Sequence, residues 1–537
     1  MVCEAISCFR QRLSSPIVER WATIDIRPAG LTLGGHNIMR RFRFVSLFFL
    51  LAGTGGVLGA DGPAGDGWIS LFDGKSLDGW RASEHPDTFR VVNGTIEAHG
   101  PRAHLFYVGP VAGARFKNFE FEAEVKTWPG ANSGIFFHTA FQDAGWPAQG
   151  YEAQINNTQA THGGYHEFKK TGSLYAVRNL YKSPVRDGEW FTLRIAVRGK
   201  RITIHLNDEL VVDYTEPAHP IRPHPRVERR LGRGTFALQG HDPDSRVAFR
   251  RLRVRLLPDD LPETPGAVPL PVDDYTQLMS LYAGNFPVID LHAHLKGGLT
   301  IEEVLAKSRA TGIGYGLALN CGLGFPTTND AGIHAFVERV RGKPLFVAMQ
   351  AEGREWTRMF SPAAIAQFDY VFTDAMTFTD PRTGRRMRLW MPDEVHVGDP
   401  DAFMDILVDQ IVRIMREEPI DVYVNATFLP AAIAADYDRL WTPARMDRVI
   451  AAAVRHHVAI EISDRYRIPS AAFIQRAKAA GVKFTFGTNN GGRDDLKHLA
   501  YPLRMIRECG LKTSDMFVPG ETPGRRDQMR APAEGSV

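Results

Sequence analysis

The chain has 537 residues, more than one ordinary domain holds, so we expect two or three domains. The 64 Lys and Arg residues nearly balance 61 Asp and Glu residues, and the formal net charge of +3 argues against nucleic acid as the main partner. A hydrophobic content of 44% with 23% charged residues excludes bulk disorder and a multispan membrane protein. Four cysteines are too few for a disulfide scaffold at this length.

The N-terminal region predicts an export signal. Three arginines precede an apolar run at residues 44–58, and small residues follow it up to Ala60. This is the order of basic, apolar and small residues in a secretory signal. We therefore predict an upstream extension over residues 1–38, a signal peptide over residues 39–60, and a secreted or periplasmic protein with no stable membrane span after cleavage. An uncleaved anchor is the alternative.

Apolar residues recur with period two between residues 66 and 257. In residues 119–126, phenylalanine, alanine and valine alternate with glutamate and lysine. Residues 191–197 alternate in the same way and turn at Gly199 into a further alternating run at residues 202–206. Because no long helical pattern interrupts these runs, they predict an antiparallel β-sandwich with one solvated face.

Several motifs follow one another in this segment. They are Leu71-Phe72-Asp73-Gly74-Lys75-Ser76-Leu77-Asp78-Gly79-Trp80, Asn132-Ser133-Gly134-Ile135, Tyr151-Glu152-Ala153-Gln154-Ile155, Thr171-Gly172-Ser173-Leu174-Tyr175 and Leu238-Gln239-Gly240-His241. On these motifs the segment resembles the 3-keto-disaccharide hydrolase family. The resemblance implies a concanavalin-like jelly-roll sandwich. It also implies cleavage of 3-keto-glycosides, by hydrolysis or by elimination followed by hydration.

One predicted strand carries the candidate base. Strand alternation would place Glu152, Gln154 and Asn156 on one face. The ketone of a 3-keto sugar acidifies the proton at carbon 2, which a carboxylate can abstract while a donor polarises the ketone. We predict Glu152 as this base. The predicted substrate-binding residues are Gln154, His138, Tyr175, Gln239 and His241.

These binding residues have different expected roles. His138, Gln239 and His241 are candidate donors or metal ligands, and Tyr175 is expected to stack on the sugar or to bond to it. The resembled family more often carries Arg at position 138. The alternative interpretation is that these polar residues only form the solvated face of the sandwich.

Residues 258–285 are first Pro-rich and then helix-like, and we predict a linker there. From 286 to 518, strand-like and helical runs alternate. The predicted strands are residues 288–292, 314–320, 345–351, 370–375, 421–426, 459–462 and 483–487. Thr300 and Glu303 predict a helix start with a capping box, and Gly312 predicts its end. Seven βα units predict an α/β, TIM-like barrel, and residues 519–537 predict a disordered tail.

Polar residues stand at the end of each predicted barrel strand, where parallel barrels place their chemistry. The His-x-His pair at the first strand end aims two imidazoles at one point. The candidate ligands for a divalent metal ion of unknown identity are His292, His294, Glu352, Asp374 and Glu461. A barrel ligand site is predicted at Asn320, Asn425 and Asn489. The alternative is a barrel without metal that binds its ligand through these amides. We expect no nucleotide cofactor.

The second half resembles the PHP (polymerase and histidinol phosphatase) family at residues 290–295 with the following helix, at Glu461 and at residues 487–489. That family comprises metal-dependent phosphoesterases on a distorted seven-stranded barrel. Asn489 and Asn425 stand where the family usually has metal ligands. The resemblance therefore implies one metal ion, held by His292, His294 and one or two carboxylates, that lowers the pKa of a bound water.

The leading functional prediction is an exported carbohydrate-active hydrolase or lyase that acts on glycosides, and on 3-keto-glycosides in particular, through the sandwich. The PHP-like barrel would be a second site, and carbohydrate the main partner. Two alternatives stay open: a glycan-binding sandwich that targets a metal-dependent, phosphoesterase-like barrel, and a non-catalytic binding protein.

Overall fold

A computed structural model describes residues 67–159, 165–224, 226–496 and 499–526. The predicted upstream extension and signal peptide lie outside these residues. Within the described residues, no helix has the length and apolar character needed to cross a bilayer.

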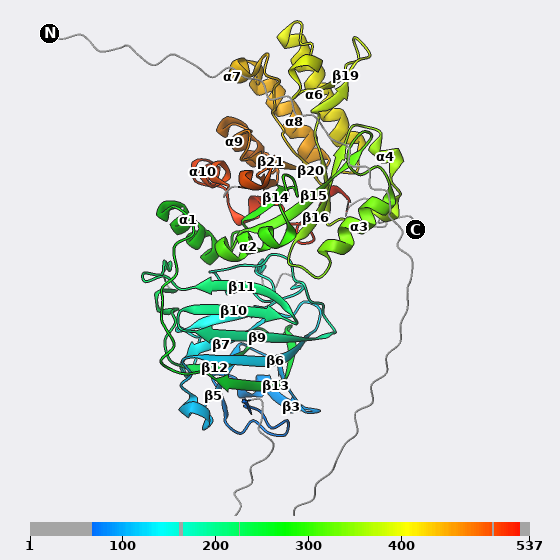
Figure 1. Cartoon of the computed structure of the whole chain (residues 1–537). Helices are drawn as coiled ribbons and strands as arrows, with labels where there is room; N and C mark the ends of the chain where they lie inside the picture. Colours follow the sequence, from blue (N-terminus) through cyan, green and yellow to red (C-terminus); the bar gives the residue numbers. More distant parts are fainter. Residues whose placement is uncertain (1–66, 160–164, 225, 497–498, 527–537) are drawn as a thin grey trace, which may run out of the picture. The chain divides into compact units, whose positions relative to one another are not determined.

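The first half of the described chain forms two antiparallel sheets, and Figure 1 shows the long strands of the larger sheet side by side. The larger sheet has the order β11-β10-β9-β6-β13-β4-β3, with β1 paired to β13. Its strands are β1 (Trp68–Ser70), β3 (Phe89–Val92), β4 (Thr95–His99), β6 (Phe119–Thr127), β9 (Trp190–Arg198), β10 (Arg201–Leu206), β11 (Glu209–Thr215) and β13 (Arg246–Leu256). The smaller sheet consists of β2 (Trp80–Ala82), β5 (Ala103–Tyr107), β12 (Thr235–Gly240), β7 (Ser133–Thr139) and β8 (Tyr151–Ile155), in that order. The predicted antiparallel β-sandwich is confirmed.

Strand β6 shows how the two sheets pack. Phe121 is fully buried and stacks on Phe236 of β12, with ring centroids 4.5 Å apart. The alternating carboxylates point the other way, as period two requires. They are not solvated, however, because Arg194 of β9 and Arg253 of β13 both bond to Glu122, which is only 5% exposed. The predicted polar face of the sheet is therefore present, but at this strand half-exposed arginines from the neighbouring strands lie over the carboxylates.

The second half forms a closed parallel barrel of seven strands. In barrel order they are β14 (Ile289–Ala293), β15 (Gly314–Gly322), β16 (Phe346–Glu352), β17 (Tyr370–Thr373), β20 (Val422–Tyr423), β21 (Ala459–Ser463) and β22 (Phe484–Gly487). The longer helices are α1 (Val272–Ala283), α2 (Ile301–Thr311), α3 (Asp330–Val340), α6 (Pro400–Glu417), α8 (Pro443–Arg455), α9 (Ala471–Ala479) and α10 (Ala500–Cys509). A small hairpin, β18 (Thr377–Thr379) with β19 (Arg386–Arg388), follows β17. The predicted seven-stranded TIM-like barrel is confirmed.

Local signals explain where barrel elements begin and end. The Thr300 hydroxyl accepts from the Glu303 N–H at 3.2 Å, and Glu303 accepts from the Thr300 N–H at 2.9 Å, so the predicted capping box starts α2. Gly312 ends the helix with φ 85°, a left-handed conformation that glycine adopts freely. The buried Asp290 of β14 accepts from the N–H of Thr488 at 3.0 Å and thereby ties the first barrel strand to the last.

The predicted C-terminal tail is partly ordered. Glu521 pairs with Lys170 at 2.5 Å, and Arg526 pairs with Asp421 at 2.8 Å. The prediction of disorder is therefore wrong for residues 519–526, because these charged side chains have buried partners that composition alone does not reveal. Residues 527–537 lie outside the described part of the chain.

Candidate functional site

A cavity of about 570 Å³ lies over the smaller sheet of the sandwich. We call it the sandwich cavity. Strand β8 contributes Glu152 and Gln154, and β12 contributes Gln239. Tyr175 and His241 also line the cavity, so five of the six sequence-predicted sandwich residues lie around it.

Strand alternation and a small residue together place the candidate base. Glu152 and Gln154 lie two apart on β8 and so face the same side. Gly134 of β7 is paired with Gln154, and a Cβ atom at Gly134 would meet Glu152 Oε1 at 2.6 Å. The glycine of the Asn-Ser-Gly motif therefore leaves the space that the carboxylate occupies.

Glu152 is buried between two donors. Its Oε2 accepts from Arg229 Nη1 at 3.2 Å, and its Oε1 accepts from Gln239 Nε2 at 3.2 Å. Burial raises the pKa of Glu152, and the charge of Arg229 opposes that rise. The carboxyl group is therefore a stronger proton acceptor than an exposed glutamate, and it lies at the wall of a cavity.

Two amide oxygens near Glu152 are buried acceptors. Gln154 donates from Nε2 to Asn132 Oδ1 at 2.8 Å, and Gln239 donates to Glu152. The Oε1 atoms of both glutamines have no hydrogen-bond partner within the described residues. Because buried polar atoms are normally satisfied, these acceptors suit hydroxyl donors of a ligand in the cavity.

His241 is oriented by its neighbour. Its Nδ1 lies 2.7 Å from Asp242 Oδ2, which favours the proton on Nδ1 and leaves Nε2 as the ring's free nitrogen. Burial opposes ionisation of Asp242, but hydrogen bonds from His241 and Ser245 outweigh it and lower the pKa of Asp242 to about 2. Trp146 packs against the imidazole with ring centroids 5.2 Å apart.

His138, predicted to bind substrate, does not line the sandwich cavity. Its Nε2 donates to the Lys117 carbonyl at 2.9 Å, and its Nδ1 accepts from the Gly232 N–H at 3.2 Å. Burial lowers the pKa of His138 to about 4. The prediction is wrong because a backbone φ of 57° at this end of β7 turns the residue into the sandwich, where both ring nitrogens are used.

Several cavity residues that the sequence did not predict lie outside the strands. They are Asn132, Trp146, Tyr165, Glu167, Arg226 and Arg229. Loop residues follow no period, so alternation could not assign them a face. The only sequence signal was the cationic run at residues 226–230, from which Arg229 reaches the candidate base.

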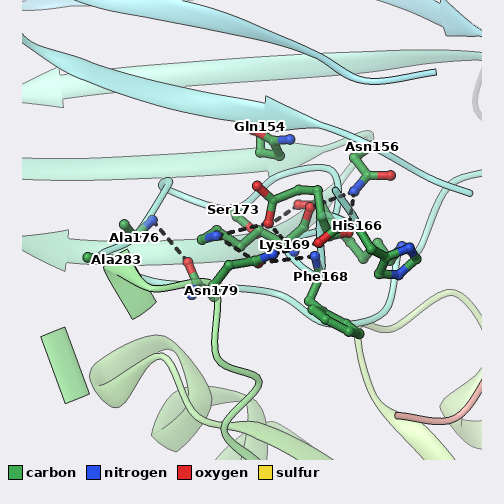
Figure 2. A network of polar contacts seen from close by, with 12 residues as sticks. Gln154, Asn156, His166, Phe168, Lys169, Ser173, Ala176, Asn179 and Ala283 are labelled. Atoms are coloured by element: carbon green, nitrogen blue, oxygen red, sulfur yellow. Dashed lines mark hydrogen bonds and ion pairs between the residues drawn. The ribbon is translucent and has the colours of Figure 1, made fainter. Parts of the chain in front are cut away.

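A buried ion pair between Glu167 and Lys169 supports one side of the cavity, and Figure 2 shows Lys169 among its polar contacts. Lys169 Nζ lies 2.9 Å from Glu167 Oε1 and 4.4 Å from the centroid of the Tyr175 ring. Asn156 Nδ2 donates to the carbonyls of Glu167 and Lys169 at 2.9 and 3.0 Å. Asn156, which was expected on the strand face beside Glu152, therefore holds the loop that carries Glu167.

The polar residues at the barrel strand ends form a second cluster, which we call the barrel mouth. A chain of hydrogen bonds joins Asn320 to Glu352 (2.9 Å), Glu352 to Gln350 (2.9 Å), Gln350 to His292 (3.3 Å) and His292 to Glu461 (2.6 Å). The sequence-predicted residues of four strands are thus brought together, and Gln350 is the link that the sequence reasoning missed.

This series of hydrogen bonds continues around the barrel. Glu461 accepts from the Asn425 N–H at 3.1 Å, Asn425 Nδ2 donates to Asp374 at 2.9 Å, and Asn489 donates to Asn425 at 3.4 Å. Asn425 and Asn489 both have left-handed backbones, with φ 50° and 48°. Burial, and then the charge of Asp374, raise the pKa of Glu352 to about 8. Glu352 therefore takes up a proton near neutral pH.

The predicted metal ligands are mostly bonded to neighbouring side chains. His292 Nδ1 and Glu461 bond to each other, and Glu352 and Asp374 bond to side-chain amides. Within the described residues, no three His, Cys, Asp or Glu side chains are arranged to hold a metal ion. His294 donates to the Ala318 carbonyl at 3.1 Å, and its buried Nε2 has no hydrogen-bond partner among the residues that the structure describes. The arrangement thus does not fit a metal cage.

A cavity of about 620 Å³ adjoins the barrel mouth at Asn489. Four arginines line it: Arg465, Arg467, Arg504 and Arg507. Arg465 donates to the Asn489 carbonyl at 3.0 Å. Positive charge therefore lies beside the amides and carboxyl groups of the mouth.

Comparison with known proteins concerns the sandwich. Residues 67–255 match the family described as a 3-keto-alpha-glucoside-1,2-lyase-like domain. A curated 3-keto-disaccharide hydrolase of Bacteroides thetaiotaomicron is 28% identical over 170 residues, which cover 28% of this chain and 59% of that protein. The sandwich is thus similar to a carbohydrate-active hydrolase domain.

Solved structures also resemble part of the chain. A Parabacteroides distasonis protein proposed to be a glycosyl hydrolase is 21% identical, with 36% of this chain and 95% of the other covered and a TM-score of 0.31. A carbohydrate binding module of Bacillus subtilis is 17% identical, covers 33% of this chain and 95% of its own, and has a TM-score of 0.24.

Proposed function

We propose that this protein cleaves 3-keto-glycosides in the sandwich cavity, with Glu152 as the base, on a concanavalin-like jelly-roll scaffold. The observation that carries the proposal is a buried carboxylate of raised pKa at the wall of a cavity that also offers unsatisfied amide oxygens. The similarity of residues 67–255 to a 1,2-lyase-like domain supports the same chemistry.

The proposed reaction is an elimination across carbons 1 and 2 of the keto sugar. Glu152 takes the proton from carbon 2, and the electrons of that C–H bond move towards the ketone as an enolate. The enolate then collapses, and the double bond forms between carbons 1 and 2. The C1–O bond breaks, and its electrons leave with the departing alcohol, which takes up a proton. Water then adds to the double bond to complete hydrolysis. The guanidinium groups of Arg226 and Arg229 on the same wall offset the negative charge that develops on the ketone oxygen.

A single substitution tests the base. Glu152→Gln keeps the shape of the side chain but removes its basicity, so kcat on a 3-keto-glucoside should fall at least about tenfold. The matched control is Glu97→Gln, which removes a carboxylate paired with Arg246 on the larger sheet and outside the cavity. An unchanged rate in Glu152→Gln would remove Glu152 as the base, and equal losses in both variants would point to a general effect on the fold.

We further propose that the PHP-like barrel supplies a second ligand site at its mouth. The continuous hydrogen-bond chain through the strand ends favours it, and so does the adjoining arginine-lined cavity. The side chains that were predicted as metal ligands bond to one another or to neighbouring amides. We therefore expect the mouth to bind its ligand through amide and carboxyl groups. The alternative is a metal-dependent, phosphoesterase-like site.

Metal analysis separates these two possibilities. Protein purified without chelator should contain well below one equivalent of divalent metal per chain and should not hydrolyse p-nitrophenyl phosphate. One tightly bound equivalent that is lost in His292→Ala would instead establish the metal site predicted from the His-x-His pair.

Export of the chain stays part of the proposal, and the N-terminal sequence of the secreted protein would test it.

A further inference from the structure

One segment of the sandwich cavity wall is held from outside the sandwich. We call residues 165–170 the cavity loop. Tyr165 and Glu167 of this loop line the cavity, and Tyr165 donates to Glu167. Lys169 pairs with Glu167 at 2.9 Å, and both side chains are almost completely buried. The position of Glu167 therefore depends on what holds the backbone and Lys169 in place.

Asn285 holds this loop with three hydrogen bonds. Its Oδ1 accepts from the Phe168 N–H at 3.2 Å and from Lys169 Nζ at 2.9 Å, and its Nδ2 donates to the His166 carbonyl at 2.6 Å. Asn285 follows helix α1 and lies beyond residue 255, where the family match ends. Its backbone is left-handed, with φ 58°, a conformation that asparagine tolerates better than most residues. Both polar atoms of this one side chain thus bond to the cavity loop.

Glu521, which follows the last barrel elements in the chain, also binds the cavity loop. Its carboxylate lies 2.7 Å from His166 Nε2 and 2.5 Å from Lys170 Nζ. The Lys170 side chain is 2% exposed and that of Glu521 is 15% exposed. A charge pair with so little solvent around it depends on both partners, since loss of one leaves the other buried and unpaired.

We propose that Asn285 and Glu521 are positioning residues that hold the cavity loop, so that the sandwich cavity has its binding shape only in the full chain. Neither residue lines the cavity, and both act through Lys169, Lys170 and the loop backbone. The expected change in KM rests on the proposed function. The expected loosening of the cavity loop does not.

The first test uses Asn285→Gly in the full chain. Glycine adopts the left-handed backbone freely, so this variant removes the side-chain contacts without adding strain. The Phe168 amide should exchange its hydrogen at least about tenfold faster, because its acceptor is gone. KM for a 3-keto-glucoside should rise about tenfold while kcat changes less than about twofold. Asn285→Asp keeps an acceptor for Phe168 and Lys169 and should restore most of the protection.

Glu521→Gln and Lys182→Met complete the design. Glu521→Gln removes the charge that His166 and Lys170 face and should also raise KM. Lys182→Met breaks the 2.7 Å ion pair with Asp369, which joins the sandwich to the barrel without contacting the cavity loop, and should leave both readouts unchanged.

Wild-type exchange and KM in Asn285→Gly would overturn the proposal, and so would an equal effect of Lys182→Met. If the wild-type chain does not turn over the keto sugar, the proposed function fails, and the exchange rate alone then decides on the positioning role.

Discussion

Arg229 controls the protonation of the candidate base. Burial raises the pKa of Glu152, and the Arg229 charge, 3.2 Å away, lowers it. Removing that charge in Arg229→Met leaves burial unopposed, so the pKa of Glu152 should rise further. Since the proposed reaction needs the deprotonated carboxylate, the acidic limb of kcat/KM against pH should move to higher pH. A pH–rate profile on a 3-keto-glucoside measures this shift.

Arg226→Met is the matched control for this shift. Arg226 lines the same wall, but its guanidinium donates to the Ala283 carbonyl and not to Glu152. Its removal should lower kcat, because its charge no longer offsets the charge that develops on the ketone oxygen, but it should not move the limb. A limb that stays in place in Arg229→Met, or that moves equally in both variants, would show that another group sets the pH dependence.

At the scale of elements, the sequence predicted the strands and the strand faces, because these follow a regular period. Alternation correctly placed Glu152 and Gln154 on one face of β8, and the strand ends correctly located the barrel mouth. The cavity loop and the run that carries Arg229 escaped prediction because irregular segments have no period. His138 was placed wrongly because a single left-handed residue turned its side chain. Contacts between residues far apart in sequence, such as Arg229 with Glu152, leave no local pattern to read.

At the scale of the whole molecule, the C-terminal segment contacts residues that lie much earlier in the chain. Arg526 pairs with Asp421, which also accepts from the Val371 N–H at 2.9 Å. Arg526 donates to the Phe368 carbonyl at 3.0 Å. Glu521 reaches the cavity loop. A polar, Arg-rich sequence predicts disorder from its composition, yet residues 519–526 bind both the barrel and the sandwich.

Two truncations test the role of this segment. A chain ending at residue 518 loses Arg526 and leaves Asp421 as a buried carboxylate without that cation, which should cost about 3 kcal/mol of unfolding free energy. It also loses Glu521, so KM for the keto sugar should rise along with the loss of stability. A chain ending at residue 526 keeps both residues and should match the full chain in denaturant unfolding and in KM.

If the two truncated chains unfold at the same denaturant concentration, residues 519–526 do not stabilise the fold. If only the shorter chain is destabilised but its KM is unchanged, the segment supports the barrel alone, because loss of Glu521 would then leave the cavity loop in place.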